Sequence, residues 1–389
     1  MRRLSLLLAR GLLAAIGVFG LLSLAGCPDE GGENIELAAR LYVLNQGEGT
    51  LFILNANTLD RIDSVNLEVT NPHYIGFDPE GEFYYVASRS IGGMITKWRA
   101  SDNTPMGSVQ MPFDFQPTSI GITPDGQTGY VVNFGGLDIT TRTKIMKLDL
   151  STMTIIPTNM TAGAMTHDCR VSDDGQFAVA CNMMTNDVTV IYLDADSVKN
   201  ISVDPDSLYP TGTQKYGPYG IWIEESEDAL AAHGGRRVFI ACQHAGQVRV
   251  MDLNDLDITD SIEISEHGHG GGSHETLYGP TQVLHDPAND HIFVTTQFEN
   301  FVWVGHPEGG AHGEEGEDFW ILRPQAIQPF GIVKSEDGRR VYFTCVNATG
   351  KGWVYAIDNF SHPPRIIDST EVGKLSYGLA WQPPVKPQP

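Results

Sequence analysis

The sequence predicts an all-β protein, a seven-bladed β-propeller, and two observations lead to that expectation. A unit of roughly 40–50 residues recurs along the chain, and each copy holds runs typical of four short strands. Tight Asp/Gly turns and residues that alternate between apolar and polar separate and mark these strands. Because one four-stranded sheet cannot bury both of its faces alone, the copies have to close into a ring around a central channel.

The first strand of each unit is expected to line the channel and to begin, in most copies, at a proline. These strands start near Pro72, Pro117, Thr166, Pro218, Pro280, Pro329 and Ser376. Most run into a turn, such as Asp-Pro-Glu-Gly at 78–81 or Ser-Asp-Asp-Gly at 172–175. Proline and aspartate favour the bend, and glycine accepts the positive φ that the turn requires.

The other three strands follow in order within each copy. The second resembles Tyr-Val-x-Asn, as at 42–45 and 130–133, the third alternates with a period of two, as at 188–191, and the fourth is weaker. The order is circularly shifted, since the chain enters at a second strand and leaves at a first strand, 376–381. We therefore expect the two ends of the chain to share the last blade and to close the ring.

The beginning of the chain resembles a bacterial lipoprotein signal. Arg2 and Arg3 precede an apolar run that ends in Leu-Ala-Gly-Cys at Cys27. The predicted division is a signal peptide at 1–26, a lipidated Cys27 with a flexible tether at 27–37, the propeller at 38–383 and a tail at 384–389. An ordinary secretory signal or an uncleaved anchor helix is the alternative. Either way we expect export, and the lipoprotein signal further predicts a lipid anchor on the periplasmic or cell-surface side of a bacterial membrane.

The repeated Tyr-Val-x-Asn, Val-x-Val-x-Asp and Pro-Asp-Gly segments resemble the bacterial YVTN-type, YncE-like seven-bladed propeller family. The likeness covers about residues 38–383, and the third to fifth blades depart from it through degenerate motifs and long insertions. The resemblance implies an exported binding scaffold and no particular reaction.

Charge and cysteine content set further bounds. The net charge is −23, and the first 26 residues hold three arginines and no acid, which leaves 22 basic against 48 acidic residues and a charge of −26. Such a surface repels nucleic acid, so we expect no nucleic-acid partner, and we expect a monomer. Cys181, Cys242 and Cys345 recur at one position of the repeat and suggest small buried side chains. Cys169 and Cys181 lie on consecutive strands, and a disulfide between them is left open.

Candidate functional residues gather on the face that we call the top, where each innermost strand begins. The second residue of each such strand should line the mouth of the channel, and these are His73, Thr118, His167, Tyr219, Thr281, Phe330 and Tyr377. Neutral imidazole suits copper, zinc or iron, and a His-rich loop follows a fourth strand on the same face. The candidate metal ligands are His73, His167, Asp168, His244, His267, His269 and His274. The alternative is that the histidines bond to backbone at the rim and that the loop binds metal only incidentally.

Three functions remain open from the sequence. The first is a scaffold that binds a small molecule or a protein at its top face, through residues such as Thr118, Tyr219, Thr281, Phe330 and Tyr377. The second is a metal-dependent oxidoreductase or metal-handling protein that uses the histidines. The third is a hydrolase resembling the propeller lactonases, with a general base at the mouth. Phosphate-binding, dinucleotide-binding, haem-attachment and serine-hydrolase motifs are absent from the sequence.

Overall fold

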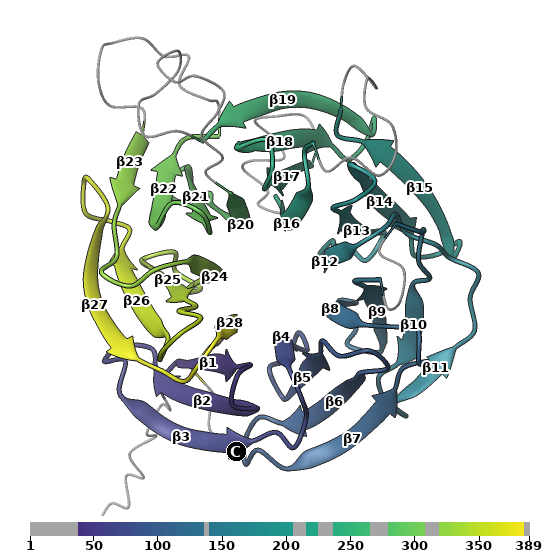
Figure 1. Cartoon of the computed structure of the whole chain (residues 1–389), viewed down its shortest axis with the longest axis horizontal. Coiled ribbons are helices and arrows are strands. Elements are labelled where there is room, and N and C mark those ends of the chain that lie inside the picture. The colour runs from purple at the N-terminus through teal and green to yellow at the C-terminus, as the bar shows by residue number, and fades with distance from the viewer. Residues whose placement is uncertain are drawn as a thin grey trace, which may run out of the picture.

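The computed structural model describes residues 38–135, 140–204, 215–224, 236–264, 279–307 and 319–384. These residues form seven four-stranded antiparallel sheets around a common axis, and no helix occurs among them (Figure 1). The predicted all-β, seven-bladed propeller is confirmed.

Each blade places its strands in the same order from the channel outward. The innermost strands are β4 (Pro72–Phe77), β8 (Pro117–Ile122), β12 (Thr166–Val171), β16 (Pro218–Ile223), β20 (Pro280–Asp286), β24 (Pro329–Lys334) and β28 (Ser376–Gln382). The second strands are β1 (Arg40–Asn45), β5 (Phe83–Ser88), β9 (Thr128–Asn133), β13 (Phe177–Asn182), β17 (Arg237–Cys242), β21 (His291–Thr296) and β25 (Arg340–Cys345). The third strands are β2 (Thr50–Asn55), β6 (Met94–Arg99), β10 (Met146–Asp149), β14 (Asp187–Tyr192), β18 (Gln247–Asp252), β22 (Phe301–Gly305) and β26 (Trp353–Asp358). The outer strands are β3 (Arg61–Asn66), β7 (Pro105–Gln110), β11 (Thr154–Ile156), β15 (Ser197–Ser202), β19 (Asp257–Glu263), β23 (Phe319–Leu322) and β27 (Arg365–Glu371).

The ring closes where the ends of the chain meet. β28 pairs antiparallel with β1, with Tyr42 opposite Ala380, and this pair completes the sheet β28-β1-β2-β3 (Figure 1). The Tyr42 hydroxyl also donates to Gln382 Oε1 at 3.1 Å. The predicted closure by N- and C-terminal strands is therefore confirmed, and it removes the free sheet edges of an open ring.

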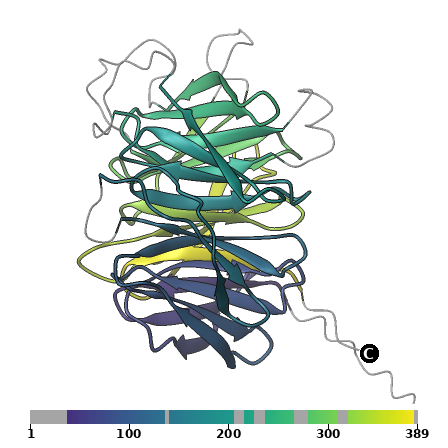
Figure 2. The same cartoon turned by 90° about the vertical axis from the view of Figure 1, so that its right-hand side faces the viewer.

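The hydrophobic core lies between neighbouring blades, which stand face against face in Figure 2. Alternate residues of one strand point to opposite faces, so β1 sends Tyr42 and Leu44 toward the blade of β5, and Leu41 and Val43 toward the blade of β25. Seven such clusters follow one another around the ring among the described residues. Each blade is thus stabilised by its two neighbours, so the ring is one cooperative unit.

The turns that end the innermost strands keep one geometry in several blades. In the turn after β12, the Ser172 hydroxyl donates to Asp174 Oδ1 at 2.7 Å, and Gly175 has φ of +67°. Gly126 and Gly338 occupy the corresponding places with φ of +67° and +66°. A side chain at these positions would be strained, so the Asp/Gly repeat in the sequence has a backbone cause.

The four cysteines that the structure describes are free and buried. Cys169 is paired in register with Ala180 rather than Cys181, and Cys169 and Cys181 pack into the cores on opposite faces of their blade. The disulfide left open by the sequence is therefore not formed, because neighbouring residues of a strand point to opposite faces. Burial raises the pKa of the Cys169 thiol to about 12.

The signal and tether predicted for residues 1–37, and nearly all of the predicted tail, lie outside the described residues. Among the described residues, no helix has the length and apolar character to cross a membrane.

Candidate functional site

The mouth of the channel at the top face is built by the second residue of each innermost strand. Five of these seven residues are aromatic or imidazole side chains that contact one another across the axis. The ring contacts are His73–Tyr377 at 5.2 Å, Tyr377–Phe330 at 4.8 Å, Phe330–Tyr219 at 5.8 Å and Tyr219–His167 at 3.6 Å between centroids. Four of the five side chains, His73, His167, Tyr219 and Phe330, are only 3–6% exposed, so the rings form a packed layer at the mouth.

Thr118 and Thr281 complete this ring of seven in a different way. The Thr118 hydroxyl donates to the Thr166 carbonyl at 2.9 Å, and the Thr281 hydroxyl donates to the Gly279 carbonyl at 3.0 Å. Both side chains are fully buried. These hydroxyls bind backbone groups, so among the predicted ligand-binding residues Tyr219, Phe330 and Tyr377 are the ones whose side chains meet at the mouth.

His73 and His167 meet at the centre of the mouth. Their Nε2 atoms are 3.1 Å apart, although the residues are 94 positions apart in the sequence. The ring centroids are 5.3 Å apart, so the two rings lie nearly end to end and each Nε2 points at the other. On the far side of His73, Nδ1 lies 2.8 Å from Gln46 Oε1. This is the geometry of an N–H···N hydrogen bond in which one imidazole donates and the other accepts.

Both imidazoles are held in the neutral form. Burial lowers the pKa of His73 and of His167 well below the usual value, and the positive charge of Arg89 lowers each pKa further. The two rings are each 4% exposed. One N–H proton therefore lies between two uncharged rings, an arrangement that can hydrogen-bond to a polar ligand.

Arg89 is the positive charge at the mouth, and the sequence analysis did not single it out. Its guanidinium carbon lies 3.8 Å from the centroid of the Phe134 ring, which is a cation–π contact. Burial raises the pKa of the Tyr219 hydroxyl, and the charge of Arg89 opposes this rise. A half-buried guanidinium beside neutral imidazoles and phenols can donate to a carboxylate or a polarised carbonyl oxygen.

The repeat itself contained a signal for Arg89. It is the first residue after a second strand, and the backbone N–H at this position donates to the residue preceding the innermost strand in each of the seven blades. The donors are Gln46, Arg89, Phe134, Met183, Gln243, Gln297 and Val346. These residues form an outer ring around the mouth, in which Gln243 and Gln297 contact each other at 2.9 Å. Alignment of the seven copies at this position would have shown one cation among uncharged residues.

Asp168, predicted as an oxygen ligand, has a different environment. Its Oδ1 accepts from the Cys169 N–H at 2.9 Å and from the Ser119 hydroxyl at 3.2 Å. Its Oδ2 accepts from the Ile221 N–H at 3.2 Å and lies 3.7 Å from Arg170 Nε. The carboxylate therefore ties three adjacent blades together at the channel wall.

Of the remaining predicted metal ligands, only His244 lies among the described residues. His244 packs over Gly217, where an added Cβ would lie 2.4 Å from His244 Cδ2, and burial lowers its pKa. His267, His269 and His274 lie outside the described residues. Within the described ranges, no group of three His, Cys, Asp or Glu side chains stands in metal-binding geometry. The Nε2 atoms of His73 and His167 point at each other, so the two rings would have to turn before both nitrogens could bind one copper, zinc or iron ion. Metal binding therefore stays a prediction.

A small cavity lies in the channel and is lined by residues of both histidine strands. Its volume is about 50 Å³, and its lining includes Thr118, His167, Asp168, Arg170 and Gln282. This volume accommodates water molecules and excludes a substrate of sugar size. A ligand at the top face would accordingly bind on the mouth and not inside this cavity.

Comparison with known proteins identifies the fold. No family model matches the chain, and no curated protein matches it in sequence. A protein of unknown function from Desulfotomaculum acetoxidans superposes with a TM-score of 0.66 at 12% identity, over 90% of this chain and 100% of that chain. A periplasmic gluconolactonase from Pseudomonas aeruginosa gives 0.65 at 17% identity, over 89% and 99%. A putative 6-phosphogluconolactonase from Bacteroides uniformis gives 0.63 at 13% identity, over 88% and 99%. At these identities the likeness shows the propeller fold alone.

Proposed function

We propose that this chain is a binding scaffold that takes up a small polar ligand at its top mouth. The observation that carries the proposal is the contact of two uncharged imidazoles, His73 and His167, beside the guanidinium of Arg89. Apolar side chains would fill the mouth without the cost of burying polar groups, so packing alone does not account for these three residues. A carboxylate or carbonyl oxygen would bind Arg89, and the imidazoles would hydrogen-bond to neighbouring hydroxyls.

A binding titration with D-gluconate tests this function. We expect saturable binding to the full chain, measured by calorimetry, and at least tenfold weaker binding to Arg89→Gln or to His167→Gln. Arg99→Gln is the matched control. Arg99 lies at the end of a third strand and forms an exposed ion pair with Asp102, with 3.0 Å between Nη1 and Oδ2. Equal affinity of the wild type and both mouth variants for gluconate would overturn the proposal.

Lactone hydrolysis is the second candidate, and the guanidinium of Arg89 beside the two histidines favours it, because a cation there can stabilise an oxyanion. A neutral histidine takes a proton from water, the resulting hydroxide attacks the lactone carbonyl carbon, and Arg89 stabilises the oxyanion. The ring C–O bond then breaks, and the departing alkoxide takes up the proton to give a hydroxy acid. Two structural neighbours are described as a gluconolactonase and a putative 6-phosphogluconolactonase, which makes gluconolactone the first substrate to test. Turnover no faster than in buffer would exclude this activity, and turnover undiminished in His73→Gln and His167→Gln would exclude the two histidines as its general base.

We further propose that the chain is a monomeric, exported lipoprotein of the YVTN-type, YncE-like family. The support is the Leu-Ala-Gly-Cys segment at Cys27, the acidic composition and the repeated Tyr-Val-x-Asn strands. Cell fractionation tests the anchor. The wild type should sediment with membranes, and Cys27→Ser should not carry lipid; identical lipid labelling of both proteins would contradict the proposal. Analytical ultracentrifugation of the purified protein tests the oligomeric state, and we expect the molar mass of one chain.

A further inference from the structure

A second cavity lies at the far end of the innermost strands, at the face opposite the His73–His167 mouth. Its volume is about 410 Å³, which is within the range of small-molecule pockets. Residues at the ends of β12, β16, β20 and β24 line it, so four consecutive blades contribute. The side chains that matter for its chemistry are Arg170, Trp222, Glu224, His285 and Lys334.

Arg170 stands between the two cavities, because it lines both of them. Its Nε is buried and has no hydrogen-bond partner among the described residues, and Asp168 Oδ2 lies 3.7 Å from it. Asp168 meanwhile accepts hydrogen bonds from Ser119, Cys169 and Ile221. The negative charge beside Arg170 is therefore largely satisfied by other donors, whereas the guanidinium retains unused donor capacity.

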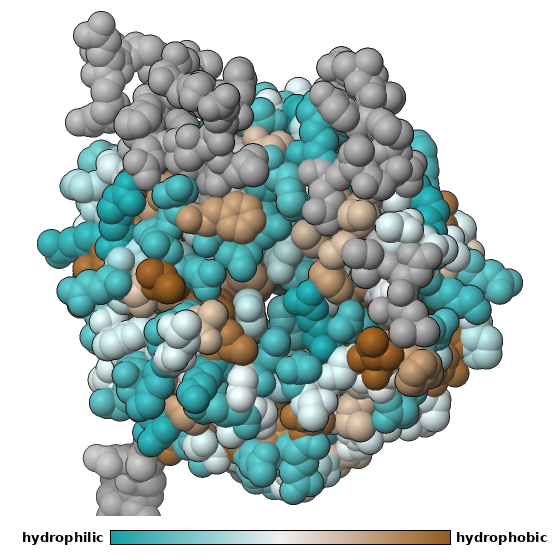
Figure 3. Space-filling view, viewed as in Figure 1, coloured by the Kyte–Doolittle hydropathy of each residue, from teal (hydrophilic) through white to brown (hydrophobic). Residues whose placement is uncertain are grey.

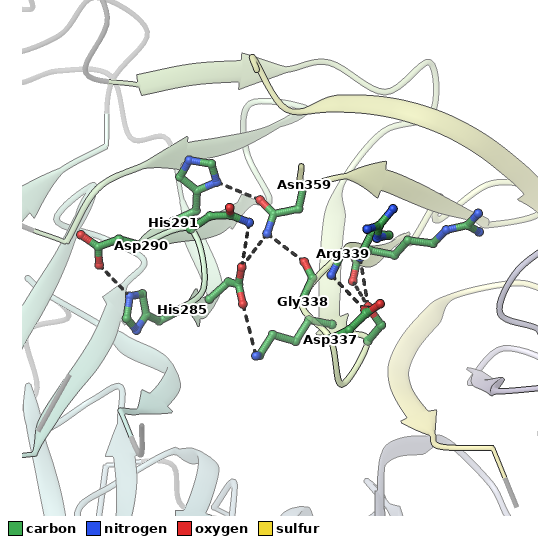
Figure 4. A network of polar contacts seen from close by, with 12 residues as sticks. His285, Asp290, His291, Asp337, Gly338, Arg339 and Asn359 are labelled. Carbon is green, nitrogen blue, oxygen red and sulfur yellow. Dashed lines mark hydrogen bonds and ion pairs between the residues drawn. The ribbon is translucent and has the colours of Figure 1, made fainter. Parts of the chain in front are cut away.

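Lys334 is in a similar position on the other side of the cavity. Its ammonium lies 3.4 Å from Asp286 Oδ1, which is a long contact for an ion pair. Asp286 Oδ2 accepts from Asn359 Nδ2 at 2.7 Å and from Asn289 Nδ2 at 3.3 Å. The Asn359 amide in turn links His291 to the Gly338 carbonyl, as Figure 4 shows. The partner of Lys334 is thus held by several neutral donors, and the ammonium has two further protons to donate.

The buried acidic group of the cavity, Glu224, is bound more tightly than the basic groups. Glu224 is 1% exposed, and its two oxygens accept from Arg237 Nε and Nη2 at 2.8 and 2.9 Å. His285 lies 3.2 Å from Glu224 Oε1 on one side and 3.2 Å from Asp290 Oδ1 on the other, and the contact with Asp290 is drawn in Figure 4. The buried carboxylate is therefore paired with a bidentate arginine, and it has little capacity left for a ligand cation.

The structure assigns this cavity as a binding site for a small organic anion. A carboxylate would accept hydrogen bonds from Arg170 Nε, which has no partner among the described residues, and from the two ammonium protons of Lys334 that Asp286 does not accept. The apolar part of the ligand would lie against the half-buried indole of Trp222, which is part of the cavity wall. Asp173, exposed at the rim, would repel a second negative charge, so the site selects a monocarboxylate over a di- or tricarboxylate.

Calorimetric titration of the full chain with benzoate tests the site, with benzyl alcohol and benzylamine as uncharged and cationic analogues. We expect saturable benzoate binding that is at least tenfold tighter than that of either analogue. Arg170→Gln and Lys334→Gln should each weaken benzoate binding at least tenfold. Lys351→Gln is the matched control, because Lys351 belongs to an exposed pair with Glu371.

Arg89→Gln separates this site from the top mouth, which is also proposed to bind a carboxylate. Loss of benzoate binding in Arg89→Gln, with full binding in Lys334→Gln, would overturn the assignment and place the anion at the mouth. Absence of saturable binding to the wild type, or equal affinities for benzoate and benzylamine, would overturn it as well. Lys334→Gln keeps the test valid if Arg170→Gln fails to fold, because Asp286 keeps its two amide donors in that variant.

Discussion

The two ends of the channel are built from the same strands and differ in how they hold polar groups. At the top, His73 and His167 form a neutral contact in which burial suppresses protonation. At the opposite end, Glu224 and Arg237 form a buried, bidentate ion pair, and the side chains of Arg170 and Lys334 line a cavity. The top depends on hydrogen bonds between uncharged groups, whereas the other end depends on paired charges.

This difference means that the two ends should respond to different perturbations. Removal of one partner from a buried ion pair leaves an uncompensated charge, which is costly at any pH at which that charge persists. A neutral histidine pair instead loses stability when acid protonates it in the unfolded chain. We call the end opposite the His73–His167 mouth the lower end. Removal of a charge should therefore reduce stability most at the lower end, and acid should reduce stability most at the top.

The largest effect should come from opening the ring, on which both ends depend. Deletion of residues 375–389 removes β28, the partner of β1, and with it Leu379, so that Leu41 and Val43 lose a core neighbour. We expect loss of cooperative thermal unfolding, measured by circular dichroism. Deletion of only 385–389 is the control and should leave the unfolding transition in place. A cooperative transition in both proteins would contradict the closed-ring account.

Arg237→Leu should be the most destabilising single substitution among those considered for the lower end. It leaves the buried Glu224 carboxylate without its bidentate partner, at a cost of about 3–5 kcal/mol in the free energy of unfolding. Urea denaturation measures this change. Arg99→Leu, which breaks an exposed pair, should cost no more than about 1 kcal/mol. Similar losses in the two variants would show that the lower end does not depend on its buried charges.

Acid should destabilise the protein through the top pair. Folding lowers the pKa of His73 and His167, so the unfolded chain binds protons near pH 6.5 while the folded mouth stays neutral. The stabilisation is complete above that pH and falls as the pH drops, by about 1.4 kcal/mol per histidine for each pH unit. Urea denaturation at pH 6.5 and 5.5 measures the slope, which should be smaller in the His73→Gln/His167→Gln variant. The exposed His362→Gln variant should keep the wild-type slope; a slope unchanged in the double variant would contradict the neutral pair.

The smallest effect should come from Arg89→Gln, which removes a charge without changing burial. The pKa of both histidines should rise, because Arg89 lowers each of them, but it should stay below the usual value, because burial is the larger cause. Histidine-selective NMR titration measures both values. Histidine pKa values unchanged in Arg89→Gln would show that Arg89 does not act on the pair. Arg99→Gln is the control and should leave both pKa values unchanged.

The repeat in the sequence predicted the ring, its seven blades and the closure by β28 and β1, because turn glycines, strand periodicity and proline positions are local requirements of the backbone. It also predicted which residues start the innermost strands, and it therefore predicted that His73 and His167 lie at the same opening. It did not predict that Asp168 would turn to the Ser119 hydroxyl and the Ile221 N–H, or that Arg89 would lie over Phe134. These depend on side-chain directions and on neighbours from other blades.

The amino-acid order by itself determined the architecture, since a four-stranded unit repeated seven times has one economical way to bury both faces of every sheet. Only the tertiary structure decided the chemistry at the two ends of the channel. The 3.1 Å approach of His73 to His167 and the cavity beside Arg170 and Lys334 join residues from separate blades. The protonation of a histidine and the unused donors of an arginine depend on burial and on distances of a few ångströms, which no spacing along the chain specifies.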